Sequence, residues 1–307
     1  STPLYSSAAS DVYKRQTSDS IIGCIAGGQS NTNAIEQITI QTLGNAIDYG
    51  DASSGRAGSG GTSNSVRGLY CMGSTPSGTT NVIDFFTIAT GGAVSDFGDF
   101  LLNTTECAVV SNSHGGLNDG YMGTRPLPFN EAGGDRMLYA GGYDGSAAVT
   151  IVEFMTVSTT GNANVFGDLG TANTHQNAGG GNKNRFLYSG GSDGGRSTII
   201  GYVEYSTLGT TKDFGDLTVG RDGLAAASNN TRFLSLGGYA GSGGGEDEID
   251  YVTIASLGNA ADFGNLSDER MYLTAVNSNS RAIVGGGKKD PANTTDIIEY
   301  VTISTLG

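Results

Sequence analysis

The sequence predicts an all-β protein, a β-propeller of about six four-stranded blades. Gly-Gly pairs recur about every 48 residues, at Gly141, Gly190, Gly237 and Gly285. The pairs are followed by a strand of the form Ile-acid-aromatic-x-Thr-Ile, with a divergent copy at Ile200 to Tyr205. A Leu-Gly-Asn-Ala turn then occurs at 43–46 and 257–260, and a full Asp-aromatic-Gly-Asp segment at 48–51, 96–99 and 213–216. The composition agrees, because 51 Gly and only 15% charged residues favour short strands joined by turns over long helices.

One repeat unit shows the expected order of four strands, which we predict at 225–228, 232–236, 249–255 and 261–266. The first contains only Ala and Ser, which suits the crowded position beside a central channel. The Gly-Gly pair after the second lets the chain turn where a side chain would collide with the next blade. Counted this way, the first of six visible blades lacks its innermost strand and the last lacks its outermost.

The repeat resembles the kelch motif, in which a strand ending in Gly-Gly precedes a strand with an acidic and an aromatic residue. The Trp common on the outer strand of kelch motifs is replaced here by Tyr49, Phe97, Phe166, Phe214 and Phe263. The repeat sequence Thr-Ile-x-Thr-Leu-Gly-Asn-Ala-x-Asp-Phe-Gly-Asp-Leu is similar to that of virion and tail repeat proteins of marine bacteriophages. The resemblance implies a kelch-like propeller, in a virion or extracellular location, with a structural or receptor-binding role.

The first sixteen residues differ from the rest. Ser6 to Gln16 resembles the translation of a transposon-end adapter used for DNA sequencing libraries. We therefore divide the chain into a non-native segment, 1–16, and a single propeller domain, 17–307. The segment is expected to lie outside the propeller core, and the domain to be a metagenomic fragment of a longer chain.

Charge and cysteine content exclude several classes of partner. The formal net charge is −14, and such a surface repels nucleic-acid phosphates and anionic membranes. No apolar run approaches membrane-spanning length. Cys24, Cys71 and Cys107 show no CxxC spacing, so we interpret them as small buried hydrophobes. The expected partner is therefore a protein or glycan surface, without nucleic acid and without membrane insertion.

The repeat creates two charged columns. An arginine lies five residues before each Gly-Gly or equivalent step, at Arg67, Arg136, Arg185, Arg232 and Arg281. An acid is second in five of the six third strands, at Glu36, Asp84, Glu153, Asp250 and Glu299. The acids could form a ring of ligands for a central cation. We favour a structural interpretation, in which each arginine pairs with an acid or with backbone carbonyls. A function confined to one site would not require the same residues in five blades.

No catalytic constellation is predicted. The two histidines, His114 and His175, occupy different positions in different blades. Kelch-type copper oxidases need a Tyr, a Cys and two His around the metal, and the adjacent Tyr70 and Cys71 are not that arrangement. Acidic loops after the Gly-Gly pairs lack the spacing of known calcium loops. We therefore expect no enzyme activity, no catalytic residues, no metal and no cofactor.

One insertion distinguishes the third blade. Between Asn112 and Arg136 lie 23 residues, where other blades have two or three. The insertion carries aromatic, Arg and acidic side chains of the kind that anchor recognition, and the candidate binding residues are Asp119, Tyr121, Arg125 and Phe129. The alternative is a neutral surface loop, since added loop length is tolerated at small cost.

Three functions remain open. The first is a structural or receptor-binding propeller of a phage particle, and the second is a secreted bacterial adhesin or carbohydrate-binding propeller. The third, a kelch-type copper oxidase, has only the fold in its favour. Capsid and tail genes beside the gene would favour the first, a signal peptide the second, and bound metal the third.

Overall fold

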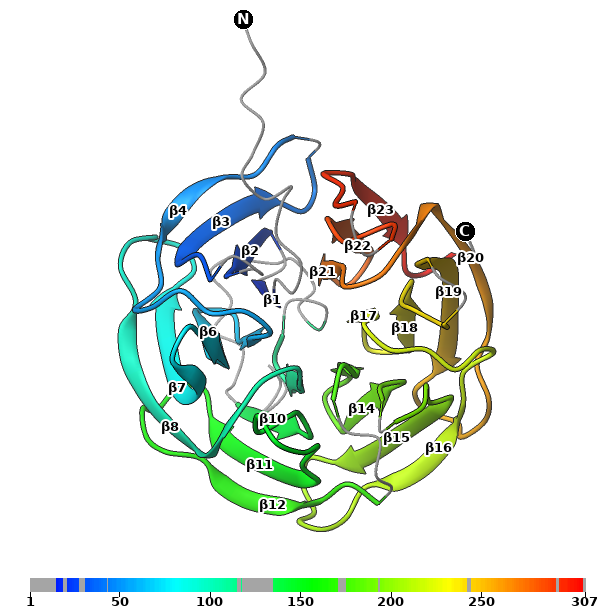
Figure 1. Cartoon of the computed structure of the whole chain (residues 1–307), viewed down its shortest axis with the longest axis horizontal. Helices are drawn as coiled ribbons and strands as arrows, with labels where there is room; N and C mark the ends of the chain where they lie inside the picture. Colours follow the sequence, from blue (N-terminus) through cyan, green and yellow to red (C-terminus); the bar gives the residue numbers. More distant parts are fainter. Residues whose placement is uncertain are drawn as a thin grey trace, which may run out of the picture.

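The repeat units fold into six antiparallel sheets that stand around a central axis like the blades of a propeller (Figure 1). The computed structural model describes residues 15–18, 21–27, 31–42, 44–114, 117, 135–170, 175–192, 194–241, 244–290 and 293–305. The all-β propeller predicted from the repeat is thereby confirmed. No helix in the described ranges has the length and apolar character needed to cross a membrane.

Strands follow one another outward within each blade, in chain order. The first three blades are β1 (Arg15–Ser18), β2 (Ile22–Ala26), β3 (Ala34–Thr39), β4 (Ile47–Asp51); β5 (Gly60–Ser63), β6 (Arg67–Thr75), β7 (Gly78–Thr87), β8 (Ser95–Thr104); and β9 (Ala108–Ser111), β10 (Arg136–Ala140), β11 (Ile151–Thr156), β12 (Asn164–Asp168). The others are β13 (Ala178–Gly181), β14 (Arg185–Ser189), β15 (Ile199–Glu204), β16 (Lys212–Asp216); β17 (Ala225–Ser228), β18 (Arg232–Leu236), β19 (Glu246–Thr253), β20 (Ala261–Arg270); and β21 (Thr274–Asn277), β22 (Arg281–Gly285), β23 (Ile298–Thr302).

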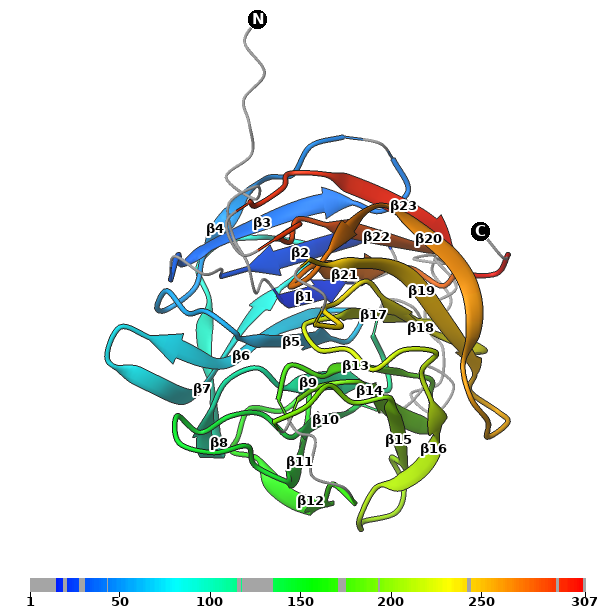
Figure 2. The same ribbon diagram turned by 45° about the vertical axis from the view of Figure 1, so that its right-hand side comes forward.

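The first blade is complete, which corrects the sequence prediction. Strand β1 pairs with β2, with Arg15 opposite Ala26 and Gln16 opposite Ile25. Backbone pairing needs no particular side chains, so a stretch without the repeat pattern can still supply the innermost strand. Strand β1 also lies against β5 and β21, which closes the ring (Figure 2). Residues 1–14 lie outside the described residues, so the non-native origin of the segment stays a prediction.

The sixth blade has three strands in the described part of the chain, as predicted. Its Gly-Gly step lies one residue later than expected: Gly286 and Gly287 have φ of 64° and 102°, the left-handed region that glycine tolerates. In the fifth blade, a Cβ at Gly238 would lie 2.9 Å from the carbonyl oxygen of Asp222. The Gly-Gly step therefore requires glycine for two reasons: its backbone is in the left-handed region, and another backbone segment lies too close for a side chain.

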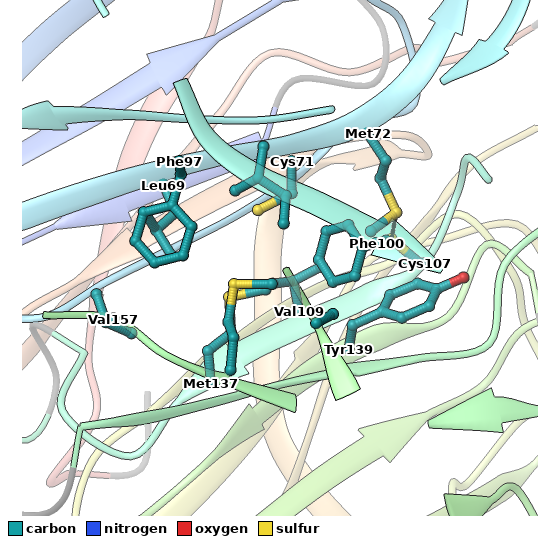
Figure 3. Close-up of a cluster of buried hydrophobic side chains, with 13 residues drawn as sticks. Leu69, Cys71, Met72, Phe97, Phe100, Cys107, Val109, Met137, Tyr139 and Val157 are labelled. Carbon is teal, nitrogen blue, oxygen red and sulfur yellow. Dashed lines mark hydrogen bonds between the residues drawn. The ribbon is translucent and has the colours of Figure 1, made fainter. Parts of the chain in front are cut away.

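Hydrophobic side chains fill the space between neighbouring blades. In the seam between the second and third blades, both blades contribute, with Leu69, Met72, Phe100, Cys107 and Tyr139 among the buried residues (Figure 3). All three cysteines are buried and none is in a disulfide, which confirms their interpretation as small buried residues.

A hydrogen-bonded contact between turns and outer strands joins the blades at their rim, and we call it the seam clasp. It consists of the Gly-Asn-x turn after the third strand of one blade and the aromatic-Gly-Asp segment in the fourth strand of the blade before. In the seam of the fourth and fifth blades, Gly258 N donates to Phe214 O (2.9 Å) and Ala260 N to Asp216 O (2.8 Å). Asp216 N in turn donates to Asn259 Oδ1 (3.1 Å).

The same pair of backbone bonds recurs at three more seams. They run from Gly92 to Tyr49 and Val94 to Asp51, from Gly161 to Phe97 and Ala163 to Asp99, and from Gly209 to Phe166 and Thr211 to Asp168. The recurrence of this geometry from seam to seam explains why both Leu-Gly-Asn-Ala and Asp-aromatic-Gly-Asp recur in the sequence.

The glycine in the outer strand is expected to be essential to the clasp. A Cβ at Gly215 would lie 2.3 Å from the carbonyl oxygen of Gly258, and Gly215 has a φ of 150°. We predict that Gly215→Ala lowers the free energy of unfolding by about 3 kcal/mol, measured by urea denaturation. Gly195→Ala is the control, because a Cβ there would meet nothing within 4 Å. Equal losses in the two variants would contradict the clasp.

Candidate binding site

The arginine column lies at the start of the second strand of each blade. Arg185 shows the pattern: its guanidinium lies over the Tyr202 ring, 5.0 Å from the centroid, and Nη1 donates to Ile254 O of the next blade (2.7 Å). The other four donate to carbonyls of the following blade, Arg67 to Val157 and Ser158, Arg136 to Tyr205, Arg232 to Ile303, and Arg281 to Ile40 and Gln41. The predicted reach to backbone carbonyls is confirmed.

The prediction that these arginines pair with the acidic column is wrong. Asp250 pairs instead with Arg221, with Oδ2 and Nη2 2.8 Å apart and both side chains buried. Asp84 pairs with Arg56, again with both side chains buried, and the partly exposed Glu299 pairs with the buried Arg270. Glu36 is buried in the first blade. The acids thus lie between blades near the rim of the core.

Sequence reasoning missed these buried arginines because they lie just beyond the repeated Asp-aromatic-Gly-Asp/Asn segment, outside the motifs that were aligned. A signal was present: each follows the last residue of the Asp-aromatic-Gly-Asp/Asn segment by five positions, at Arg56, Arg221 and Arg270. In the second, fifth and sixth blades, an arginine and an acid therefore occur together.

The third blade has the acid without the arginine. Thr104 occupies the arginine position before it. Glu153 is fully buried, and its Oε2 accepts a hydrogen bond from Leu101 N (3.1 Å). Its Oε1 has no hydrogen-bond partner in the described part of the chain. Burial raises the pKa of Glu153 from 4.5 to about 7.

The two histidines lie on opposite faces of the ring. His114 is buried, with Nε2 3.1 Å from Gly181 O and 3.4 Å from Ser228 Oγ, and burial lowers its pKa to about 4. His175 packs against Tyr143 on the opposite face, with ring centroids 5.7 Å apart. Within the described ranges, no group of three or more His, Cys, Asp or Glu side chains is placed to hold a metal ion.

Hydrogen bonds fix both ends of the insertion in the third blade, Asn112 and Asp135, which we call its base. Its candidate residues Asp119, Tyr121, Arg125 and Phe129 lie outside the described residues. At its start, Asn112 Oδ1 accepts from Arg136 N (2.9 Å). At its end, Asp135 accepts from Asn64 Nδ2 (3.0 Å) and Ser158 N (2.8 Å), which ties the base to the second and third blades.

A groove of about 750 Å³ opens beside this base, along the third to fifth blades. Its lining is mainly polar and includes Asn112, Asp135, Arg136, Asn182, Lys183, Asn184, Arg185, Glu204 and Ser206, with Ile254 and Ala255 as an apolar wall. The guanidiniums of Arg136 and Arg185 lie over the rings of Phe154 and Tyr202 and donate to carbonyls of the following blade. Amide, hydroxyl and charged groups in a concave site can orient a polar ligand.

The opposite face also carries aromatic side chains. Tyr143 and Tyr239, which directly follow Gly-Gly pairs, are half-buried there. Arg196 lies over the Tyr239 ring, 4.1 Å from its centroid, and its Nε is 3.5 Å from Asp222 Oδ2. Burial raises the pKa of Asp222, while Arg196 acts to lower it.

Comparisons with known proteins identify the fold alone. No protein-family model matches the chain, and no curated protein matches its sequence. The solved structure of YjhT is similar, with a TM-score of 0.74 over 96% of this chain and 95% of that one, at 11% sequence identity. The chain therefore has a β-propeller architecture, and a fold does not by itself assign a function.

Proposed function

We propose that this chain is a non-catalytic binding propeller of a phage particle, and that it recognises a glycan or protein surface partner through the groove beside the insertion. One observation carries the proposal: the 750 Å³ groove is lined by Asn112 and Asp135, the residues at the two ends of the insertion. A feature confined to one blade is not needed to build the repeat.

Support for a role without catalysis comes from the placement of titratable groups. His114 and His175 lie on opposite faces of the ring, and Glu36, Asp84, Glu153 and Asp250 of the acidic column are buried. The proposed assignment to a virion rests on the repeat sequence, which resembles the repeats of phage virion and tail proteins. The polar lining of the groove favours a glycan as the partner.

Exchanging the insertion tests the proposal. Residues 113–135 would be replaced by Asn-Thr, the two residues that connect Asn229 to Arg232 in the fifth blade. The new connection should fold, because Arg232 N donates to Asn229 Oδ1 (2.8 Å) just as Arg136 N donates to Asn112 Oδ1. We expect at least a tenfold loss of binding on a glycan array and on bacterial cells, with circular dichroism unchanged.

A point variant separates the groove from the insertion. Lys183→Ala is expected to weaken binding, and Asn230→Ala is the matched control at the same loop position of the fifth blade. Unchanged binding by both the loop exchange and Lys183→Ala would move the site to another face.

A further inference from the structure

Two charged side chains of the fourth blade depart from the repeat, and both line the groove beside the insertion. They are Lys183, in the loop between β13 and β14, and Glu204, the last residue of β15. Residues that are needed to build a blade recur from blade to blade. A charge that occurs in one blade only, and in the lining of a cavity, therefore points to a ligand.

The loop that carries Lys183 is fixed through its backbone. The carbonyl of Lys183 accepts a hydrogen bond from Asn112 Nδ2 (3.4 Å). In the next blade, the carbonyl of Asn230 accepts from Asn182 Nδ2 in the same way (3.2 Å). The repeat thus uses the carbonyl at this position, and the lysine side chain is an addition to the groove. The equivalent residues of the second, fifth and sixth blades are Ser65, Asn230 and Asn279.

Glu204 replaces a threonine. It lies opposite Arg185 in the β14–β15 ladder, and the residue opposite the column arginine in four other blades is Thr87, Thr156, Thr253 or Thr302. Glu204 is exposed, and within the described ranges its carboxylate forms no ion pair, not even with Arg185. Its two oxygens can therefore accept hydrogen bonds from a ligand in the groove.

The other charged side chains of the lining leave the groove with an excess of donors. Arg136 and Arg185 each use only Nη1 for a carbonyl of the following blade, in the part of the chain that the structure describes. Their Nε and Nη2 groups remain as donors for a planar anion. Asp135 has both oxygens engaged, by Asn64 Nδ2 and Ser158 N. The 750 Å³ space thus combines three cationic side chains with the single carboxylate of Glu204.

We propose that the groove selects an acidic saccharide, in which a sugar carries a carboxylate or sulfate group; this inference rests on the proposed binding role of the groove. Lys183 binds the anionic group as a point charge, with the guanidinium of Arg185 as a second donor. Glu204 accepts hydrogen bonds from neighbouring hydroxyls of the sugar. A neutral saccharide keeps only the hydroxyl contacts, so the charge of the ligand determines specificity.

Matched oligosaccharides that differ only at C6 are the probes. One pair contains glucuronic acid or glucose, a second contains galacturonic acid or galactose, and 6-sulfated hexoses form a third arm. We expect calorimetry to show at least tenfold tighter binding of an acidic member than of its neutral partner. The uronate and sulfate arms distinguish the two sources of the negative charge.

Two variants restore the residues of the other blades and should therefore fold. Lys183→Asn is expected to weaken binding of the acidic member about tenfold and to leave the neutral member unchanged. Glu204→Thr is expected to weaken both members about fivefold, because hydroxyls are common to both. Asn279→Ala, at the position of Lys183 in the sixth blade, is the control and should change neither affinity.

The outcomes separate this inference from the proposed function. Equal binding of acidic and neutral members, lost when the insertion is exchanged, would overturn the selection of acidic sugars and leave the groove as a glycan site. A preference for acidic members that persists in Lys183→Asn would also overturn it, because the anionic group would then bind elsewhere. Binding of no saccharide would overturn both.

Discussion

Replacing Arg221 by Met is expected to lower the free energy of unfolding by about 3 to 5 kcal/mol. Arg221 and Asp250 are both buried, and Asp250 also accepts hydrogen bonds from the amide and hydroxyl of Thr218. Without the guanidinium, the carboxylate stays in the seam with its charge uncompensated. Urea denaturation at pH 7.5 measures the loss.

The double variant Arg221→Met, Asp250→Asn distinguishes lost pairing from lost packing. It removes both charges and keeps an acceptor for Thr218, so most of the stability should return. A single variant that loses less than about 1 kcal/mol would show that the pair lies in a more solvated environment than its burial indicates.

Replacing Glu153 by Gln is expected to stabilise the protein above neutral pH. The pKa of Glu153 is raised in the folded state, from 4.5 to about 7, so the folded protein binds the proton more tightly than the unfolded chain. Wild-type stability is therefore lost as pH rises from about 4.5 to about 7. At pH 8 the loss amounts to about 3 kcal/mol, from 1.36 kcal/mol for each pKa unit.

Chemical denaturation between pH 4 and pH 8 checks this expectation. The Glu153→Gln variant should lack this decline, and its advantage over wild type should appear only as pH rises. Glu204→Gln, at an exposed carboxylate in the groove, controls for removal of one negative charge. The same decline in Glu153→Gln as in wild type would assign the pH dependence to other groups.

The sequence predicts those parts of the fold that recur. Strands β17 and β18 have the predicted bounds, because Ala-rich and Gly-Gly-terminated strands are distinctive. Strand β1 was missed because pairing of a short strand leaves no side-chain pattern. Arg221 was missed because its position is visible only after the units are aligned through their linkers. The arginine column was correctly expected to reach carbonyls, but its stacking on third-strand aromatics such as Tyr202 has no signal in spacing alone.

The candidate site was predictable only in part. The insertion was evident as an interruption of the repeat, and its base lies beside the 750 Å³ groove, which has Lys183 and Glu204 in its lining. Those two residues come from the fourth blade and belong to no motif, so only the assembled ring brings them to Asn112 and Asp135.

The location of the binding face is tested most directly by hydrogen exchange with and without the glycan that binds most strongly on the array. Binding in the groove predicts slower exchange at 182–185 and 204–206, with 239–241 on the opposite face unchanged. Slower exchange confined to 143–148 and 239–241 would contradict the account and place recognition on the face of the Gly-Gly loops.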